Sequence, residues 1–231
     1  MEGDILKKNI GSSIVTQAIM SALSLCPGLS ILVDQYSNYQ QTIQYNNIVD
    51  VLTTHAEQIS KLKDSCLDKS YRTSPDYVKD VLSTIQIAKD ELNEEKRKIY
   101  ATYLTACCHK DNTSDKNKSI YLDYLGRIDF LDCYILKSLT RFYNGRNALE
   151  NSYLSYKREH DENVRKLDVQ IHLEHLVSMG LIERCDKEEV DKFNQRVKNV
   201  LPRDKSFKNL NYYQRTYLGD ELYNYIMRAS C

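Results

Sequence analysis

The sequence predicts a mainly α-helical protein, and three observations lead to this fold class. Only seven glycines and three prolines occur in 231 residues, so tight turns are few. Charged residues make up 28% of the chain and lie between apolar residues that recur every three or four positions. Such spacing is typical of amphipathic helices that bury one face against their neighbours. We therefore expect an antiparallel helical bundle followed by a smaller α+β domain.

The N-terminal region contains an uncharged apolar segment, because no charged residue occurs in residues 9–33. A membrane-spanning helix needs about 20 mostly apolar residues, but Pro27 and Gly28 interrupt this segment. We expect residues 12–33 to form a helical hairpin packed in the protein core, with membrane insertion as the alternative. The absence of a basic start and of a small-x-small cleavage site argues against a secretory signal. The apolar residues expected to carry either role are Ile14, Ile19, Leu23, Leu29, Ile31 and Leu32.

Further helices are expected throughout residues 1–146, which we interpret as the bundle domain. The apolar period extends over residues 29–66, 74–109 and 120–143. The second of these segments opens with a helix-start signal made by Ser74 as N-cap, Pro75 at the first helical position and Asp76 in the first turn.

The apolar period and the charge content of the sequence change after residue 146. Residues 147–163 are rich in charge and weak in apolar period, so we expect a connecting segment, either an exposed helix or a linker. In the last domain, residues 164–231, a helix should end at Gly180 in the left-handed conformation, with Leu181 packing back on Leu176. We then expect a strand over residues 181–184, a helix over 186–201, a strand over 212–216 and a closing helix with Leu218, Leu222, Tyr225 and Ile226.

This order of elements resembles the end of a winged-helix domain. The residues that carry the resemblance are Leu173, Leu176, Val177, Gly180, Leu181 and Ile182, followed by Thr216, Gly219 and Leu222. The chain departs from the family in the charged helical insertion at residues 187–201, where a plain hairpin is expected. The resemblance implies a winged-helix-like α+β domain and, as in many family members, contact with DNA.

The distribution of charge bears on that implication. Basic and acidic residues number 32 each, so no net charge attracts the chain to nucleic acid or to an anionic membrane. The helix expected in residues 162–179 is slightly acidic, which is unusual for a helix that reads a DNA groove. The nucleic-acid alternative therefore depends on the basic region 192–215, where only Asp204 opposes Lys192, Arg196, Lys198, Arg203, Lys205, Lys208 and Arg215.

No catalytic motif is present, so we expect neither an enzyme nor a bound cofactor. The sequence lacks a Walker loop, a dinucleotide fingerprint and a nucleophile elbow. Cys107 and Cys108 are interpreted as packing residues of a helix end. His172 and His175 share a helical face with Asp168, but no second pair completes a zinc shell, so no metal site is expected. Seven scattered cysteines fit a reducing cytoplasm, with membrane association as the alternative.

The chain as a whole is similar in style to the abortive-infection alpha family of bacterial helical proteins. The similarity rests on Leu125, Leu131, Asp132, Ile135, Leu136 and Leu139, and on the winged-helix-like end. It implies a bacterial protein linked to phage defence. The family has no known active site that could be assigned to residues of this chain. The leading hypothesis is thus a non-enzymatic interaction or regulatory protein with a protein partner or self-association. Nucleic-acid binding through residues 192–215 and membrane action through residues 12–33 are the alternatives.

Overall fold

A computed structural model describes residues 43–139, 148–185 and 213–227. The predicted hairpin residues Ile14, Ile19, Leu23, Leu29, Ile31 and Leu32 lie outside the described residues, as does the helix expected in residues 186–201. The described part of the chain is mainly helical, as predicted, with one small two-stranded sheet.

The chain divides into two compact units. The first consists of Met1–Arg127 together with Tyr225–Cys231, and the second of Ile128–Asn224. The predicted domain boundaries at residues 146 and 164 stay predictions.

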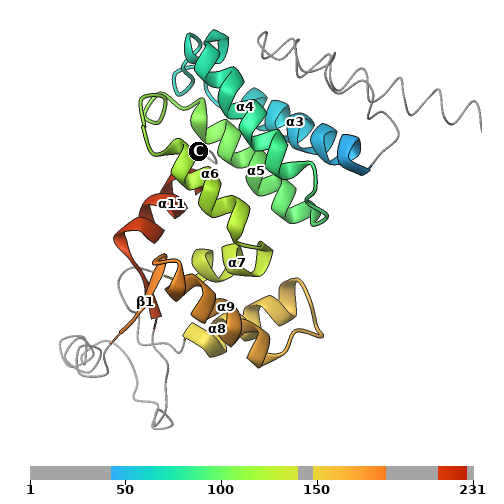
Figure 1. The fold of residues 1–231 in the computed structure, drawn as a ribbon, viewed down its shortest axis with the longest axis vertical. Helices are drawn as coiled ribbons and strands as arrows, with labels where there is room; N and C mark the ends of the chain where they lie inside the picture. Colours follow the sequence, from blue (N-terminus) through green and yellow to red (C-terminus); the bar gives the residue numbers. More distant parts are fainter. Residues whose placement is uncertain (1–42, 140–147, 186–212, 228–231) are drawn as a thin grey trace, which may run out of the picture. The chain divides into compact units, whose positions relative to one another are not determined.

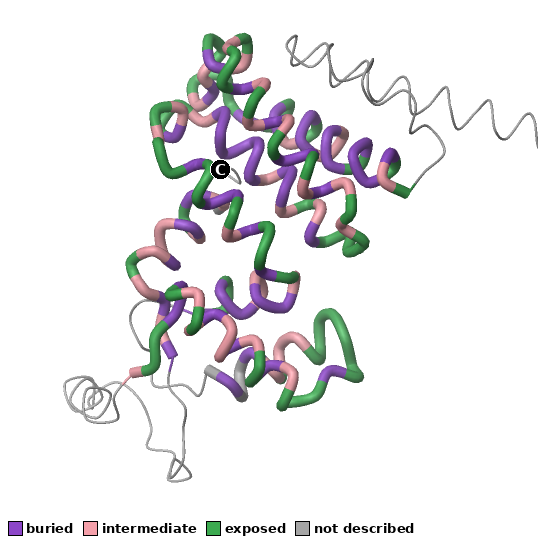
Figure 2. The backbone as a smooth tube through the Cα atoms, viewed as in Figure 1, coloured by how far each residue is buried: buried purple, intermediate pink, exposed green. Residues whose placement is uncertain are grey.

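Helices packed along their apolar faces form the first unit. They are α3 (Ile43–Lys61), α4 (Pro75–Ala88), α5 (Glu94–Cys107) and α6 (Lys118–Arg127), with a 3-10 turn at Tyr71–Thr73. Helix α5 contacts α3, α4 and α6 (Figure 1). Buried positions recur along the packed sides of these helices (Figure 2), and Val81, Ile85 and Leu104 are fully buried. Lys96 is also buried, and its Nζ donates to the Leu125 carbonyl in the last turn of α6, where a cation is favourable.

Capping side chains divide two segments that we had predicted as continuous helices. The predicted helix over residues 74–109 is two helices, because the Asn93 side chain accepts a hydrogen bond from the Lys96 N–H and begins α5. The block predicted over residues 120–143 is divided in the same way, since Asp129 starts a new helix with a capping box. The cap predicted at Ser74 is confirmed, and its side chain accepts from the Tyr77 N–H.

The second unit contains three helices that pack on one another. These are α7 (Phe130–Ser138), α8 (Ala148–Glu159) and α9 (Lys166–Ser178). Helix α8 lies in the predicted connecting segment, and it packs on both α7 and α9 rather than forming a linker. Strand β1 (Ile182–Arg184) then pairs antiparallel with β2 (Tyr213–Arg215), and helix α11 (Tyr217–Met227) follows.

A glycine-centred turn joins α9 to β1, as predicted. Gly180 has a φ of 71° and its N–H donates to the Val177 carbonyl, while the Leu181 N–H donates to the Leu176 carbonyl. These two bonds complete a Schellman motif. The Thr216 hydroxyl donates to the Gly180 carbonyl over 2.7 Å and so holds the start of α11 against this turn.

Gly219 allows the same region to pack closely. A Cβ at this position would lie 2.0 Å from the Leu181 carbonyl oxygen, so any side chain here would force the backbone to move. The Gly219 N–H donates to the Thr216 hydroxyl, so the Thr216 side chain caps the start of α11. The Thr-x-x-Gly pattern seen in the sequence therefore has a structural reason.

Candidate functional site

Helix α9 presents two chemically different faces. Val169, Leu173 and Leu176 are fully buried against the rest of the second unit. On the opposite side Leu167 and Ile171 are each 56% exposed, with exposed Gln170 beside them. We call Leu167, Gln170 and Ile171 the α9 outer face. Two large apolar side chains one helical turn apart form a small exposed apolar surface that another molecule can cover.

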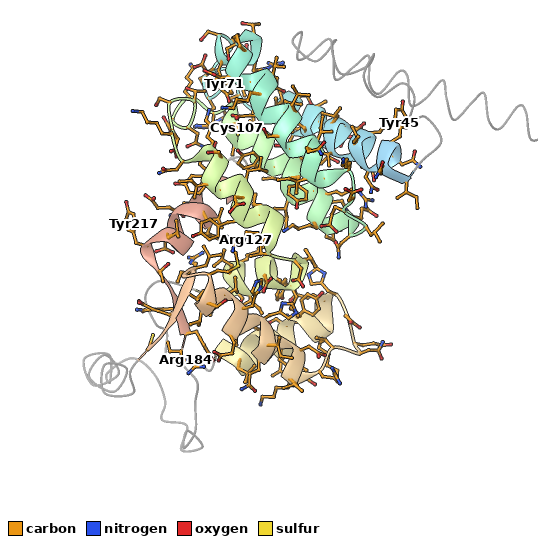
Figure 3. The ribbon with its side chains drawn as sticks, viewed as in Figure 1. Tyr45, Tyr71, Cys107, Arg127, Arg184 and Tyr217 are labelled. Atoms are coloured by element: carbon orange, nitrogen blue, oxygen red, sulfur yellow. The ribbon has the colours of Figure 1, made fainter. Side chains whose placement is uncertain are left out.

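The acidic residues next to this face are paired within the unit. Asp168 accepts from Arg165 over 2.7 Å, and this hydrogen bond lowers the pKa of Asp168 to about 2. Glu174 accepts from the Tyr213 hydroxyl over 2.8 Å and forms an ion pair with Arg184, which is labelled in Figure 3. These contacts neutralise the carboxylates locally and leave the apolar pair as the distinctive feature of the helix.

A polar cluster lies on another side of α9. The Asp132 carboxylate, from the first turn of α7, accepts from His172 Nδ1 through one oxygen and from His175 Nδ1 through the other. Both N–O distances are 3.0 Å. We call Asp132, His172 and His175 the Asp–His cluster. The two histidines were singled out in the sequence with Asp168, whereas Asp132 was missed as their partner.

Burial and hydrogen bonding act in opposite directions on Asp132. The side chain is 1% exposed, and burial alone would raise its pKa. Hydrogen bonds from His172 and from the Asp129 N–H, together with the charges of both histidines, hold the pKa below its usual value. The bond to Asp132 in turn raises the pKa of His172. The carboxylate is therefore ionised and held in one position.

Of the predicted nucleic-acid-binding residues, the described part of the chain includes Arg215 alone. Its side chain is 10% exposed, forms a 2.8 Å ion pair with Asp220 and lies 3.9 Å from the centre of the Tyr223 ring. Arg215 is thus engaged inside the unit and is a poor phosphate ligand. Lys192, Arg196, Lys198, Arg203, Lys205 and Lys208 lie outside the described residues.

The adjacent cysteines at the end of α5 lie in the first unit. Cys107 and Cys108 are fully buried, and burial raises the pKa of the Cys107 thiol to about 12. The Tyr225 hydroxyl donates to Cys107 Sγ over 3.3 Å. Cys107, labelled in Figure 3, is therefore a protonated packing residue rather than a nucleophile.

The first unit also contains a hollow of about 670 Å³ beside α4 and α6. Its lining carries charges of both signs, including Asp76, Lys79 and Lys118. Lys118 lies 3.8 Å from an Asp80 oxygen and 3.9 Å from the centre of the Tyr71 ring. Because the lining combines acidic and basic side chains, it does not converge on one class of ligand, and we assign no function to this hollow.

The chain was compared with protein-family models, with curated proteins and with solved structures, and none of the three comparisons found a match. Among the helices of the described residues, none combines the length and the apolar character needed to cross a membrane.

Proposed function

We propose that this chain is a non-enzymatic regulatory protein that contacts protein through the α9 outer face. The observation that carries the proposal is the exposure of Leu167 and Ile171 on a helix whose neighbouring carboxylates are already paired. Apolar side chains that can be desolvated at the centre of a contact supply most of the free energy of protein association.

The arrangement of the second unit supports a winged-helix-like interpretation. Three mutually packed helices lead through the Gly180 turn into an antiparallel strand pair. The part from α9 through this turn to β1 follows the predicted order of elements. In this interpretation α9 occupies the recognition position. A groove-reading helix presents arginine, lysine or asparagine to base edges, whereas α9 presents leucine and isoleucine. Protein contact is therefore favoured over DNA reading.

The partner that best fits the α9 outer face is a second copy of this chain. In an antiparallel pair of α9 helices, Leu167 of one copy lies against Ile171 of the other, so the contact complements itself. Two apolar residues per copy bury little area, so we expect weak, concentration-dependent association.

Sedimentation equilibrium of the full chain over a range of concentrations tests this proposal. We expect the wild type to dimerise weakly and the double variant Leu167→Glu/Ile171→Glu to stay monomeric. Leu92→Glu is the matched control, because Leu92 is 75% exposed and belongs to the first unit. A wild type that is monomeric throughout, or a double variant that dimerises like the wild type, would refute the proposal.

The similarity to the abortive-infection alpha family extends the proposal to bacterial phage defence. Phage should then form fewer plaques on bacteria that express the chain than on bacteria that carry an empty vector. The double variant should lose this protection and Leu92→Glu should keep it. Equal plaque numbers on bacteria with the wild type and with the empty vector would refute the phage-defence proposal. The dimer proposal would be unaffected.

A further inference from the structure

We propose that the Asp–His cluster binds a divalent transition-metal ion of the zinc class. Asp132, His172 and His175 each place one ligand atom so that all three atoms lie within 4.8 Å of one another. Within the described ranges, no other group of three histidine, cysteine or acidic residues meets that condition. Two imidazoles and one carboxylate are a ligand set that zinc and related ions accept in proteins.

The distances in the cluster are close to those that an ion requires. Bonds of about 2.0–2.1 Å from a tetrahedral zinc ion place two ligand atoms about 3.3 Å apart. The carboxylate oxygens of Asp132 lie 3.0 Å from Nδ1 of His172 and of His175. These two pairs, each made by a different Asp132 oxygen, have to separate by only about 0.3 Å, while all three ligand atoms lie within 4.8 Å of one another.

The carboxylate is positioned before any ion arrives. Asp132 is 1% exposed, and one of its oxygens also accepts from the Asp129 N–H over 3.0 Å. A metal ligand that is fixed by a further hydrogen bond loses little freedom on binding. The side chains of His172 and His175 are 23% and 40% exposed, so an ion can reach them from solvent. With three protein ligands, the fourth position is left to water.

The charges around the cluster favour a cation. An Asp129 carboxylate oxygen lies 3.5 Å from His172 Nδ1, and the Asp168 carboxylate also acts on this histidine. Coordination requires each Nδ1 to lose its hydrogen, and in a neutral imidazole this hydrogen moves to Nε2. A neutral ring binds after this change of tautomer, and a protonated ring first has to release a proton.

A bound ion would link α7 to α9 through side chains that are 40 and 43 residues apart in sequence. It would thus stabilise the packing behind the α9 outer face. This role is independent of the partner that the outer face contacts, so the two proposals can fail separately.

The test is a titration of the full-length, reduced and metal-free protein with Zn²⁺ by calorimetry, and with Co²⁺ by visible absorption. We expect one ion per chain. His172→Gln and His175→Gln should each weaken binding by at least about tenfold. Even the loss of a residue that only hydrogen-bonds to a metal ligand weakens metal affinity by that factor. His109→Gln, a histidine of the first unit, should bind like the wild type. Zn²⁺ should raise the melting temperature of the wild type and of His109→Gln more than that of the other two variants.

Three results would overturn the proposal. The first is no uptake of Co²⁺ by the wild type. The second is unchanged affinity in both His172→Gln and His175→Gln, provided that circular dichroism shows both variants folded. The third is a strong near-ultraviolet charge-transfer band with Co²⁺, because thiolate ligands produce it and it would assign the ion to a cysteine, such as the partly exposed Cys66, Cys133 or Cys185.

Discussion

A buried histidine in the first unit should make the protein sensitive to mild acid. His55 is 1% exposed, and both of its ring nitrogens are hydrogen-bonded. Nδ1 lies 2.8 Å from the Thr105 hydroxyl oxygen, and Nε2 lies 2.8 Å from the Tyr77 hydroxyl oxygen. Burial lowers the pKa of His55 to about 3, so the folded protein keeps this imidazole neutral.

The size of the effect follows from proton linkage. An unfolded chain has a histidine pKa of about 6.5. Between pH 6.5 and pH 3 the unfolded state therefore binds a proton at His55 that the folded state does not, and the free energy of unfolding falls as pH falls. Each pH unit in this range costs about 1.4 kcal/mol. Between pH 7 and pH 5 the contribution of His55 amounts to about 2 kcal/mol.

Urea unfolding of the wild type and of His55→Gln at pH 7 and pH 5 isolates this contribution, because the other titrating groups are common to both proteins. We expect His55→Gln to be less stable at pH 7, since a cavity and altered hydrogen bonds remain. The stability difference should then shrink by about 2 kcal/mol at pH 5. A difference that is equal at the two pH values would show that His55 takes up a proton as readily in the folded protein as in the unfolded chain, contrary to its burial.

Two further predictions concern backbone packing and helix capping. Gly219→Ala should lower the free energy of unfolding by more than about 2 kcal/mol, because the new Cβ would lie 2.0 Å from the Leu181 carbonyl oxygen. In the matched control Gly126→Ala the new Cβ lies 3.3 Å from the Ile87 side chain, which has to give by only a few tenths of an ångström, so urea unfolding should detect a change within about 1 kcal/mol. Similar losses in the two variants would contradict the reasoning. Asp129→Ala should cost about 1 kcal/mol in the same assay by removing the capping box of α7, and an unchanged midpoint would argue against that cap.

Local signals were the part of the fold that the sequence predicted well. Ser74 begins α4 and Gly180 ends α9 in the left-handed conformation, because each effect depends on one side chain and its nearest backbone. Strand β1 was expected for the same reason, since it follows directly from the turn at Gly180.

The helix breaks were missed because the apolar period continues across them. Asn93 and Asp129 lie in segments whose three-and-four spacing is intact on both sides. Their side chains offer the backbone a cap that competes with continued helix, and this preference is weaker in the sequence than the apolar period. The result was one predicted helix where the structure has two.

The Asp–His cluster shows a different limit of sequence reasoning. The spacing of His172 and His175 correctly placed them on one helical face, but Asp132 is 40 residues from His172. Helical periodicity tells which residues face a neighbour without telling which neighbour it is. A partial signal was nevertheless present, because Asp132 is an acidic residue at a position that the apolar pattern of α7 places inside.

Arg215 illustrates why a charge count along the sequence overestimates a basic surface. It was counted in the basic region, yet Asp220 and Tyr223 of α11 enclose it. Helical spacing brings those two residues to the side of α11 that meets the preceding strand. Replacing Arg215 would leave the partly buried Asp220 carboxylate without this ion pair and would destabilise the second unit. Loss of nucleic-acid binding in such a variant would therefore report unfolding and not a lost phosphate contact. A valid test of the basic region changes Lys192, Arg196, Lys198, Arg203, Lys205 and Lys208 and leaves Arg215 intact.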